Sequence, residues 1–241
     1  MVIKKPGKFK VLRPASANVD LLVSKGIQHT QWLNVNDFEK KMSWGVWDSK
    51  NPHQYFDEDS VYVVNGNVHL ASSLKPKSFG KHIAPYAIGL IESKQSYGRG
   101  IVSVELSLPS TFGTHAAVWL YNSCEEIDLL EAYNRSTRAR YNNWLGIPNW
   151  MLETNFHFDN NKIKTKRHPV FFDVTKHKLE VTCWRTDGFV NIYYNGHLIR
   201  SKKTKDFARP MRLIINNGVL SGTPALSYSE VVVTNMLVGE V

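Results

Sequence analysis

Three acidic residues stand close together in one apolar segment, Glu126-Ile-Asp-Leu-Leu-Glu131. Carboxyl groups held this close repel one another, which raises the pKa of at least one and leaves another ionised. Retaining hydrolysis of a sugar bond needs two such groups, one as a nucleophile and one as a general acid. The segment therefore predicts chemistry on a glycosidic bond. The alternative is an acidic edge strand that only discourages aggregation.

The pattern of this segment also predicts an irregular strand. Side chains alternate between the two faces of a strand, so a regular strand would separate Glu126 from Glu131. One extra residue at Leu129-Leu130, a β-bulge, would sort the polar and apolar groups, and bulges are frequent beside active sites. The polar face would then carry Glu126, Asp128, Glu131 and Tyr133.

The rest of the chain predicts the strands that must position these groups. Short alternating segments dominate, and long helical patterns are missing. Asn65-Gly66 and Asn195-Gly196 each separate two alternating segments, which is the signature of a β-hairpin. Many short strands with turn signals predict an all-β sandwich or barrel.

Composition limits the remaining possibilities. The chain has 241 residues, of which 42% are hydrophobic, and its net charge is +9. No apolar run is long enough to span a membrane, and Cys124 and Cys183 are too few for a disulfide scaffold. The basic start of the chain lacks the apolar segment of a signal peptide. We therefore expect a basic arm over residues 1–30 and a single domain over residues 31–241.

Several segments together resemble glycoside hydrolase family 16. Residues 126–131 are similar to its catalytic signature in the form with a β-bulge, in a family that includes laminarinases, agarases, porphyranases and κ-carrageenases. Four more regions follow in the family's order: residues 91–109, 113–119, 184–196 and 210–216. One departure lies in residues 113–119, where His115 and Ala116 replace a Trp and a Pro of the family pattern. A sugar-stacking aromatic is therefore absent or moved.

This resemblance implies a fold and a set of roles. The fold is a concanavalin A-like jelly roll of two antiparallel sheets with a concave glycan cleft. Glu126 would be the nucleophile, Glu131 the general acid and then the base, and Asp128 would hydrogen-bond the nucleophile. Retention would set the two glutamates about 5–5.5 Å apart. Negative neighbours would raise the pKa of Glu131.

The resemblance implies no required cofactor and no catalytic metal. Some members of the family carry a structural calcium ion on the convex face. Ser229 or Glu230 stands where the family often has an Asp, which weakens the case for calcium in this chain.

Alternation and the resemblance together yield candidate substrate-binding residues. Exposed aromatic rings stack on sugars, and polar side chains on the catalytic face bind hydroxyl groups. Each residue could instead be structural: a core tryptophan, a surface histidine or an anchor of a loop. The candidates are Trp119, Tyr133, Arg135, Trp144, Trp150, Asn155, His157, Trp184 and Asn216.

The sequence thus predicts a retaining, endo-acting hydrolase of a β-1,3/1,4-glucan or a β-galactan. Basic clusters at residues 135–140 and 162–167 leave open a sulfated or otherwise anionic glycan, with solvated loop charge as the alternative. A catalytically silent jelly-roll lectin is the second hypothesis. No nucleic-acid motif accompanies the charge, so we expect neither nucleic acid nor membrane as a partner. We expect a monomer that acts outside the cell or is carried by a virus or phage.

Overall fold

The computed structural model describes residues 29–40, 53–134, 150–157, 165–169, 174–203, 207–221 and 226–240. These ranges form two packed β-sheets, which confirms the prediction of an all-β sandwich. The helical elements within them are short 3-10 turns: η1 (Val35–Asp37), η2 (Glu58–Ser60) and η4 (Val174–Lys176). Within the same ranges, no helix is both long and apolar enough to cross a membrane.

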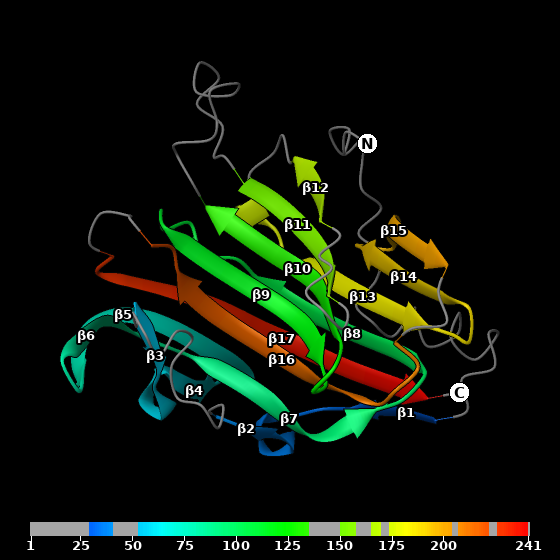
Figure 1. Cartoon of the computed structure of the whole chain (residues 1–241), viewed down its shortest axis with the longest axis horizontal. Helices are drawn as coiled ribbons and strands as arrows, with labels where there is room; N and C mark the ends of the chain where they lie inside the picture. The colour runs from blue at the N-terminus through cyan, green and yellow to red at the C-terminus, as the bar shows by residue number, and fades with distance from the viewer. Residues whose placement is uncertain are drawn as a thin grey trace.

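Ten strands form the sheet at the back of Figure 1. Its main path runs β15 (His197–Lys203), β14 (Phe189–Tyr194), β13 (Leu179–Arg185), β8 (Gly100–Ser107), β17 (Tyr228–Glu240), β5 (Asn67–Phe79), β6 (His82–Ile88) and β3 (Gln54–Phe56). Two strands pair beside this path, β1 (His29–Trp32) with β17 and β4 (Val61–Val64) with β5. Strand β3 runs parallel to β6, a local exception to the antiparallel order that the sequence predicted.

Seven strands form the sheet at the front of Figure 1. Its order is β12 (Lys166–Pro169), β11 (Trp150–His157), β10 (Glu126–Asn134), β9 (Thr114–Tyr121), β16 (Met211–Val219), β7 (Leu90–Tyr97) and β2 (Phe38–Glu39). All of these neighbours pair antiparallel. The segment with the three acids is therefore an inner strand of this sheet.

Two hairpins turn at the positions that the sequence predicted. Asn65 and Gly66 connect β4 to β5 with φ angles of 51° and 80°. Asn195 and Gly196 connect β14 to β15 with φ angles of 48° and 75°. Both residues of each turn have positive φ, the conformation of a two-residue hairpin turn, which asparagine and glycine tolerate best.

The main hydrophobic core lies between the two sheets. Ile127, Ala132 and Phe156 of the seven-stranded sheet pack in one cluster with Val104 and Val181 of the other sheet. A second, smaller cluster includes Phe56, Tyr86, Trp119 and Ile214. This smaller cluster joins the β3–β6 end of the ten-stranded sheet to the outer side of the seven-stranded sheet.

Candidate active site

Strand β10 contains the predicted bulge. On strand β11, Asn155 pairs with Asp128 and Glu153 pairs with Glu131, so two residues of β10 oppose one residue of β11. The pairing with β9 shifts at the same place and identifies Leu129 as the extra residue. The prediction of a bulge at Leu129-Leu130 is confirmed, and its physical reason is the sorting of polar from apolar side chains.

A tyrosine of the opposite sheet secures the bulge. The hydroxyl of Tyr194, on β14, donates a hydrogen bond of 2.8 Å to the backbone carbonyl of Leu129. Tyr194 is buried in the core. Because a bulge disrupts the local ladder of hydrogen bonds, this carbonyl depends on a partner from outside its own sheet.

Replacing this tyrosine should therefore loosen the bulge. In Tyr194→Phe the buried carbonyl of Leu129 loses its partner, and we expect the free energy of unfolding to fall by about 1–3 kcal/mol. Urea unfolding measures the change. Tyr193→Phe on the same strand is the matched control, and an equal loss in both variants would contradict a specific role for Tyr194.

The bulge places functional side chains of neighbouring strands on one side of the seven-stranded sheet. We call this outer side, which bears Glu126, Asp128 and Glu131, the carboxylate face. The register across β11, β10 and β9 gives four rows: His157, Glu126 and Tyr121; Asn155, Asp128 and Trp119; Glu153, Glu131 and Ala117; Met151, Tyr133 and His115. The candidates Tyr133, Asn155 and His157 are thus brought together with the three acids.

His157 connects two of the three acids. Its Nε2 lies 2.9 Å from Asp128 Oδ2 and 3.3 Å from Glu126 Oε1. The hydrogen bond to Asp128, which outweighs partial burial, raises the pKa of His157. The sequence placed His157 near the trio, and the structure agrees.

Glu131 has a separate set of partners. The Tyr133 hydroxyl donates to Oε1 at 2.7 Å, and His115 Nε2 lies 3.2 Å from the same oxygen. The side-chain amide of Asn155 donates to Oε2. Three groups from β9, β10 and β11 therefore hold this carboxyl in one orientation.

Burial and neighbouring groups shift the pKa values of the three carboxyl groups in different directions. Burial, together with the charge of Asp128, raises the pKa of Glu126 to about 7. Burial also raises the pKa of Asp128. Burial acts on Glu131 in the same direction, but His115 and Tyr133 outweigh it and lower the pKa of Glu131. The sequence predicted a raised pKa for Glu131, and this prediction is wrong for the free site.

The raised pKa of Glu126 makes a prediction about stability. A carboxyl whose pKa is higher in the folded than in the unfolded protein stabilises the fold at low pH, and this contribution is lost as the pH rises through the folded value. For Glu126 the window runs from about 4.5 to about 7. We expect Glu126→Gln to be more stable than the wild type at pH 8, by about 1–3 kcal/mol, and equal to it at pH 4. Urea unfolding at both pH values measures this, and a pH-independent difference would contradict it.

The sugar-stacking role predicted for Trp119 is wrong in this structure. Trp119 lies on the carboxylate face beside Asp128, but only 3% of it is exposed. Its ring packs in the second hydrophobic cluster against Tyr121, and its Nε1 donates to Asn216 Oδ1 at 2.9 Å. Asn216 is itself buried. The curled β3–β6 end of the ten-stranded sheet covers both residues. We therefore interpret them as structural supports of the carboxylate face.

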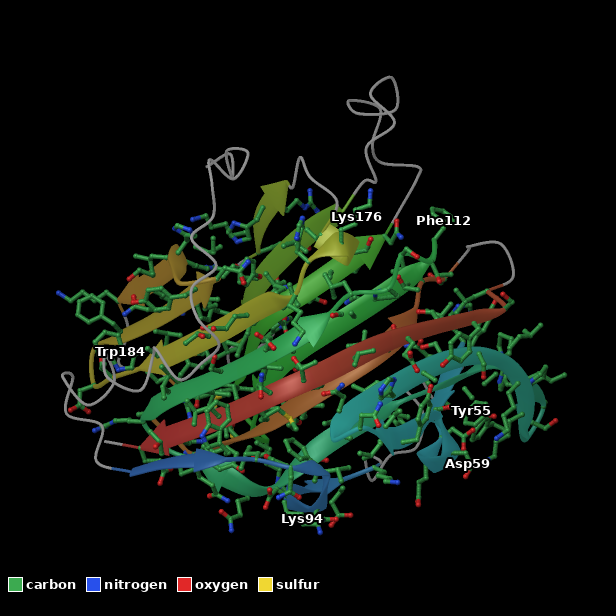
Figure 2. The ribbon with its side chains drawn as sticks, turned by 180° about the vertical axis from the view of Figure 1, so that it is seen from behind. Tyr55, Asp59, Lys94, Phe112, Lys176 and Trp184 are labelled. Carbon is green, nitrogen blue, oxygen red and sulfur yellow. The ribbon has the colours of Figure 1, made fainter. Side chains whose placement is uncertain are left out.

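Trp184 lies elsewhere in the molecule. Its strand β13 belongs to the ten-stranded sheet, where Trp184 pairs with Ile101 and Asn191. Its neighbour Cys183 points into the core, so Trp184 faces the outer side of that sheet (Figure 2). The alternation was correct, but the assignment to the catalytic face was wrong, because the alternation of one strand does not reveal which sheet the strand joins.

Three candidates cannot be assigned to the face. Arg135 and Trp144 lie outside the described residues. The backbone of Trp150 begins β11 and pairs with Asn134, while its side chain is outside the described part. Their predicted contacts with substrate stay predictions.

Two further residues lie on the carboxylate face: Glu153, which the sequence did not single out, and Arg167, which it gave only as part of the basic cluster at residues 162–167. Glu153 is buried in the row of Glu131, and Arg167 of β12 pairs with it through an Nε–Oε1 contact of 2.9 Å. The alternation that identified Asn155 and His157 also includes Glu153 and could have identified it. The sequence could not show that Arg167 pairs with Glu153, because the pairing of its strand with β11 is not visible in the sequence.

Among the residues that the structure describes, one group of side chains in the site could hold a cation. Glu126, Asp128 and His157 offer ligand atoms within 4.8 Å of one another. Burial raises the pKa values of Glu126 and Asp128, which favours a bound proton at this group. On the other sheet, Glu230 pairs with His69 and accepts from Tyr62 and Tyr228, and structural calcium there stays a prediction.

The structure is a two-sheet β-sandwich with crowded carboxylates on the outer face of one sheet. Such paired carboxyl groups are typical of an enzyme that hydrolyses glycosidic bonds. The chain belongs to the glycosyl hydrolases family 16, whose family model matches residues 48–227. The family resemblance that the sequence motifs indicated is therefore confirmed, as is the prediction of a glycoside hydrolase.

Solved structures show the same fold at low sequence identity. An endo-1,3-beta-glucanase (laminarinase) catalytic domain from Thermotoga petrophila is 15% identical with a TM-score of 0.68, covering 89% of this chain and 97% of that chain. The kappa-carrageenase of Pseudoalteromonas carrageenovora is 14% identical with a TM-score of 0.64, covering 88% and 96%. A lichenase from a mouse hindgut metagenome is 13% identical with a TM-score of 0.68, covering 88% and 98%. Comparison with curated protein sequences finds no significant match.

Proposed function

We propose that the protein is a retaining, endo-acting β-glycan hydrolase with Glu126 as the nucleophile and Glu131 as the general acid and base. The bulge at Leu129 carries this proposal, because it puts both glutamates on the carboxylate face. Two carboxyl groups on the same face can act together on one sugar bond. The separation of about 5–5.5 Å that retention requires stays a prediction.

The proposed reaction has two steps. In the first, Glu126 bonds to the anomeric carbon while Glu131 gives a proton to the departing oxygen. In the second, Glu131 takes a proton from the water that releases the sugar from Glu126. Each carboxyl therefore needs a different protonation state when the sugar bond breaks.

The contacts of Asp128 support the role of Glu126. Adjacent buried carboxyl groups cannot both ionise easily, so Glu126 and Asp128 share a proton and titrate as a pair. Asp128 is the more deeply buried of the two and also has a raised pKa. With the shared proton on Asp128, Glu126 is ionised and accepts a hydrogen bond as it attacks.

Family membership and the likeness to glucanases and a carrageenase support a β-glycan as substrate. Two arginines that the register places on the carboxylate face already have partners within the protein. Arg167 pairs with Glu153, and Arg212 pairs with Glu92. Lys166 and Arg200 contact the core-facing side of β11 instead. This favours a neutral glucan over a sulfated galactan.

A panel of glycans tests the proposal. We expect new reducing ends from laminarin or lichenan, with products of intermediate length appearing early, as endo cleavage requires. Agarose and kappa-carrageenan test the galactan alternative at low and high salt, because salt weakens the binding of a sulfated chain. Cleavage of none of these glycans would contradict the proposal, and binding without cleavage would support the lectin alternative.

A further inference from the structure

An ion pair continues the row of Glu131 toward the edge of the seven-stranded sheet. Glu153 of β11 pairs with Glu131 in the strand register, and Arg167 of the edge strand β12 pairs with Glu153. The Nε of Arg167 donates a hydrogen bond of 2.9 Å to Oε1 of Glu153. Neither member of the ion pair belongs to the acidic trio, so the proposed reaction leaves both without a role.

The two side chains of this ion pair differ in exposure. The side chain of Arg167 is 58% exposed, whereas that of Glu153 is only 12% exposed. The contact uses Nε, and within the described part of the chain the two Nη groups of Arg167 make no further hydrogen bond. Because a guanidinium group is planar, a partner that fixes Nε also fixes the plane of the Nη groups. A buried carboxylate therefore orients an exposed pair of hydrogen-bond donors.

The opposite side of the same row is covered. On β9 and β16 the row of Glu131 continues with Ala117 and Asn216, which are only 7% and 6% exposed. Ala117 packs in the second hydrophobic cluster with Phe56 and Tyr86 of the β3–β6 end. Figure 1 shows β12 and this β3–β6 end on opposite sides of β10. A sugar that binds beside Glu131 is therefore directed toward β11 and β12.

We propose that Arg167, oriented by Glu153, is a specificity-determining residue that binds hydroxyl groups of the departing part of the glycan. This inference rests on the proposed role of Glu131 as the general acid. Because Glu131 protonates the departing oxygen, the departing chain begins at Glu131. Strand β12 lies two strands from β10, roughly 10 Å away, so Arg167 meets the first sugars of that chain.

The ion pair also indicates which kind of sugar it suits. The carboxylate of Glu153 balances the charge of Arg167, so the pair as a whole carries no net charge. A sulfate group would have to compete with this carboxylate for the guanidinium, whereas a neutral hydroxyl group needs only the unused Nη donors. The pair therefore favours the departing part of a neutral glucan.

A purely structural role for Arg167 predicts a different pattern of activity. If Arg167 only neutralised the buried carboxylate of Glu153, its loss would disturb the neighbouring Glu131 and slow every substrate. A residue that binds the departing sugars affects only substrates that have such sugars. An aryl glycoside has an aromatic leaving group in their place, so the two substrates together separate the two roles.

The test compares kcat/KM for Arg167→Gln on the glycan that the wild type cuts and on an aryl glycoside of the disaccharide that it releases. On the glycan we expect a loss of about tenfold or more, mainly through a higher KM, because hydrogen bonds from a charged donor are lost. On the aryl glycoside we expect a value within about twofold of the wild type. Arg167→Lys keeps a charge for Glu153 but not the planar donors, and it should show the same pattern.

The position of cleavage tests the side on which Arg167 acts. In an oligosaccharide labelled at its reducing end, the labelled product is the departing part. When the departing sugars bind less tightly, cleavage should move toward the reducing end and give shorter labelled products in Arg167→Gln than in the wild type. An unchanged pattern, or longer labelled products, would place Arg167 outside the binding of the departing sugars.

The matched control is another arginine in an ion pair. Arg99, whose side chain is 46% exposed, pairs with Asp187 in the turn between β13 and β14 of the other sheet. Arg99→Gln should keep both activities within about twofold, because exposed ion pairs contribute little. Urea unfolding shows that each variant is folded. An unchanged kcat/KM of Arg167→Gln on the glycan, or an equal loss on the aryl glycoside, overturns the inference.

These outcomes also distinguish the inference from the proposed function. If the wild type cuts a glycan and Glu126→Gln does not, but Arg167→Gln and Arg167→Lys behave as the wild type, the inference fails and the proposed function stands. If the wild type cuts no glycan, the proposed function itself fails.

Discussion

Glu126→Gln should cut the preferred glycan at least about a thousandfold more slowly than the wild type. The amide has the size of the carboxyl group but cannot form the covalent bond to the sugar. The variant should fold, because removing a buried carboxyl with a raised pKa relieves the fold at neutral pH. Reducing-end assays at matched concentrations measure the loss, and urea unfolding shows that the fold is intact.

The control for this variant is a glutamate on the other sheet. Glu105, on β8 of the ten-stranded sheet, forms an ion pair of 2.9 Å with the half-exposed Lys178. Glu105→Gln should keep activity within about threefold, because an ion pair with an exposed partner contributes little to stability. Equal activity of Glu126→Gln and the wild type would remove Glu126 from the mechanism.

Glu131→Ala should show a loss that depends on the leaving group. A general acid contributes about 10²–10⁴-fold, so hydrolysis of the natural glycan should fall by that factor. An aryl glycoside with a good leaving group should still form the glycosyl-enzyme, which then accumulates because no base activates water. Added azide should restore turnover, since this anion fits the space of the missing carboxyl and attacks without a base.

The dependence on the leaving group assigns the two roles. Azide rescue in Glu131→Ala, but not in Glu126→Gln, is expected only if Glu131 is the acid and base. The reverse pattern would exchange the roles and would agree with the protonation of the free site, where Glu126 has the higher pKa. Glu180→Gln on the ten-stranded sheet is the control, and it should respond to neither test.

The sequence predicted the bulge because the order of residue types left one simple solution. Three acids and several apolar residues could be sorted to separate faces only with an extra residue near Leu129, and the register shows this residue. The same alternation placed Asn155 and His157 correctly. The hairpins at Asn65 and Asn195 followed from their Asn-Gly turns. Local sequence patterns were sufficient for features that one strand or one hairpin determines: the bulge, the face of a side chain and the position of a turn.

Contacts between segments far apart in the chain were not visible in this way. The sequence could not show that β13 lies in the other sheet and takes Trp184 away from the acids. It could not show that the β3–β6 end covers Trp119. His115 was visible only as a departure from the family pattern, and its contact with Glu131 reverses the pKa shift that crowding alone predicted.

The anomeric form of the first product tests the central claim most directly. Proton NMR during early cleavage of a soluble β-glucan should show the β-anomer first, followed by slow mutarotation to the equilibrium mixture, because two displacements retain configuration. Appearance of the α-anomer first would mean a single displacement by water, and it would contradict a covalent intermediate on Glu126.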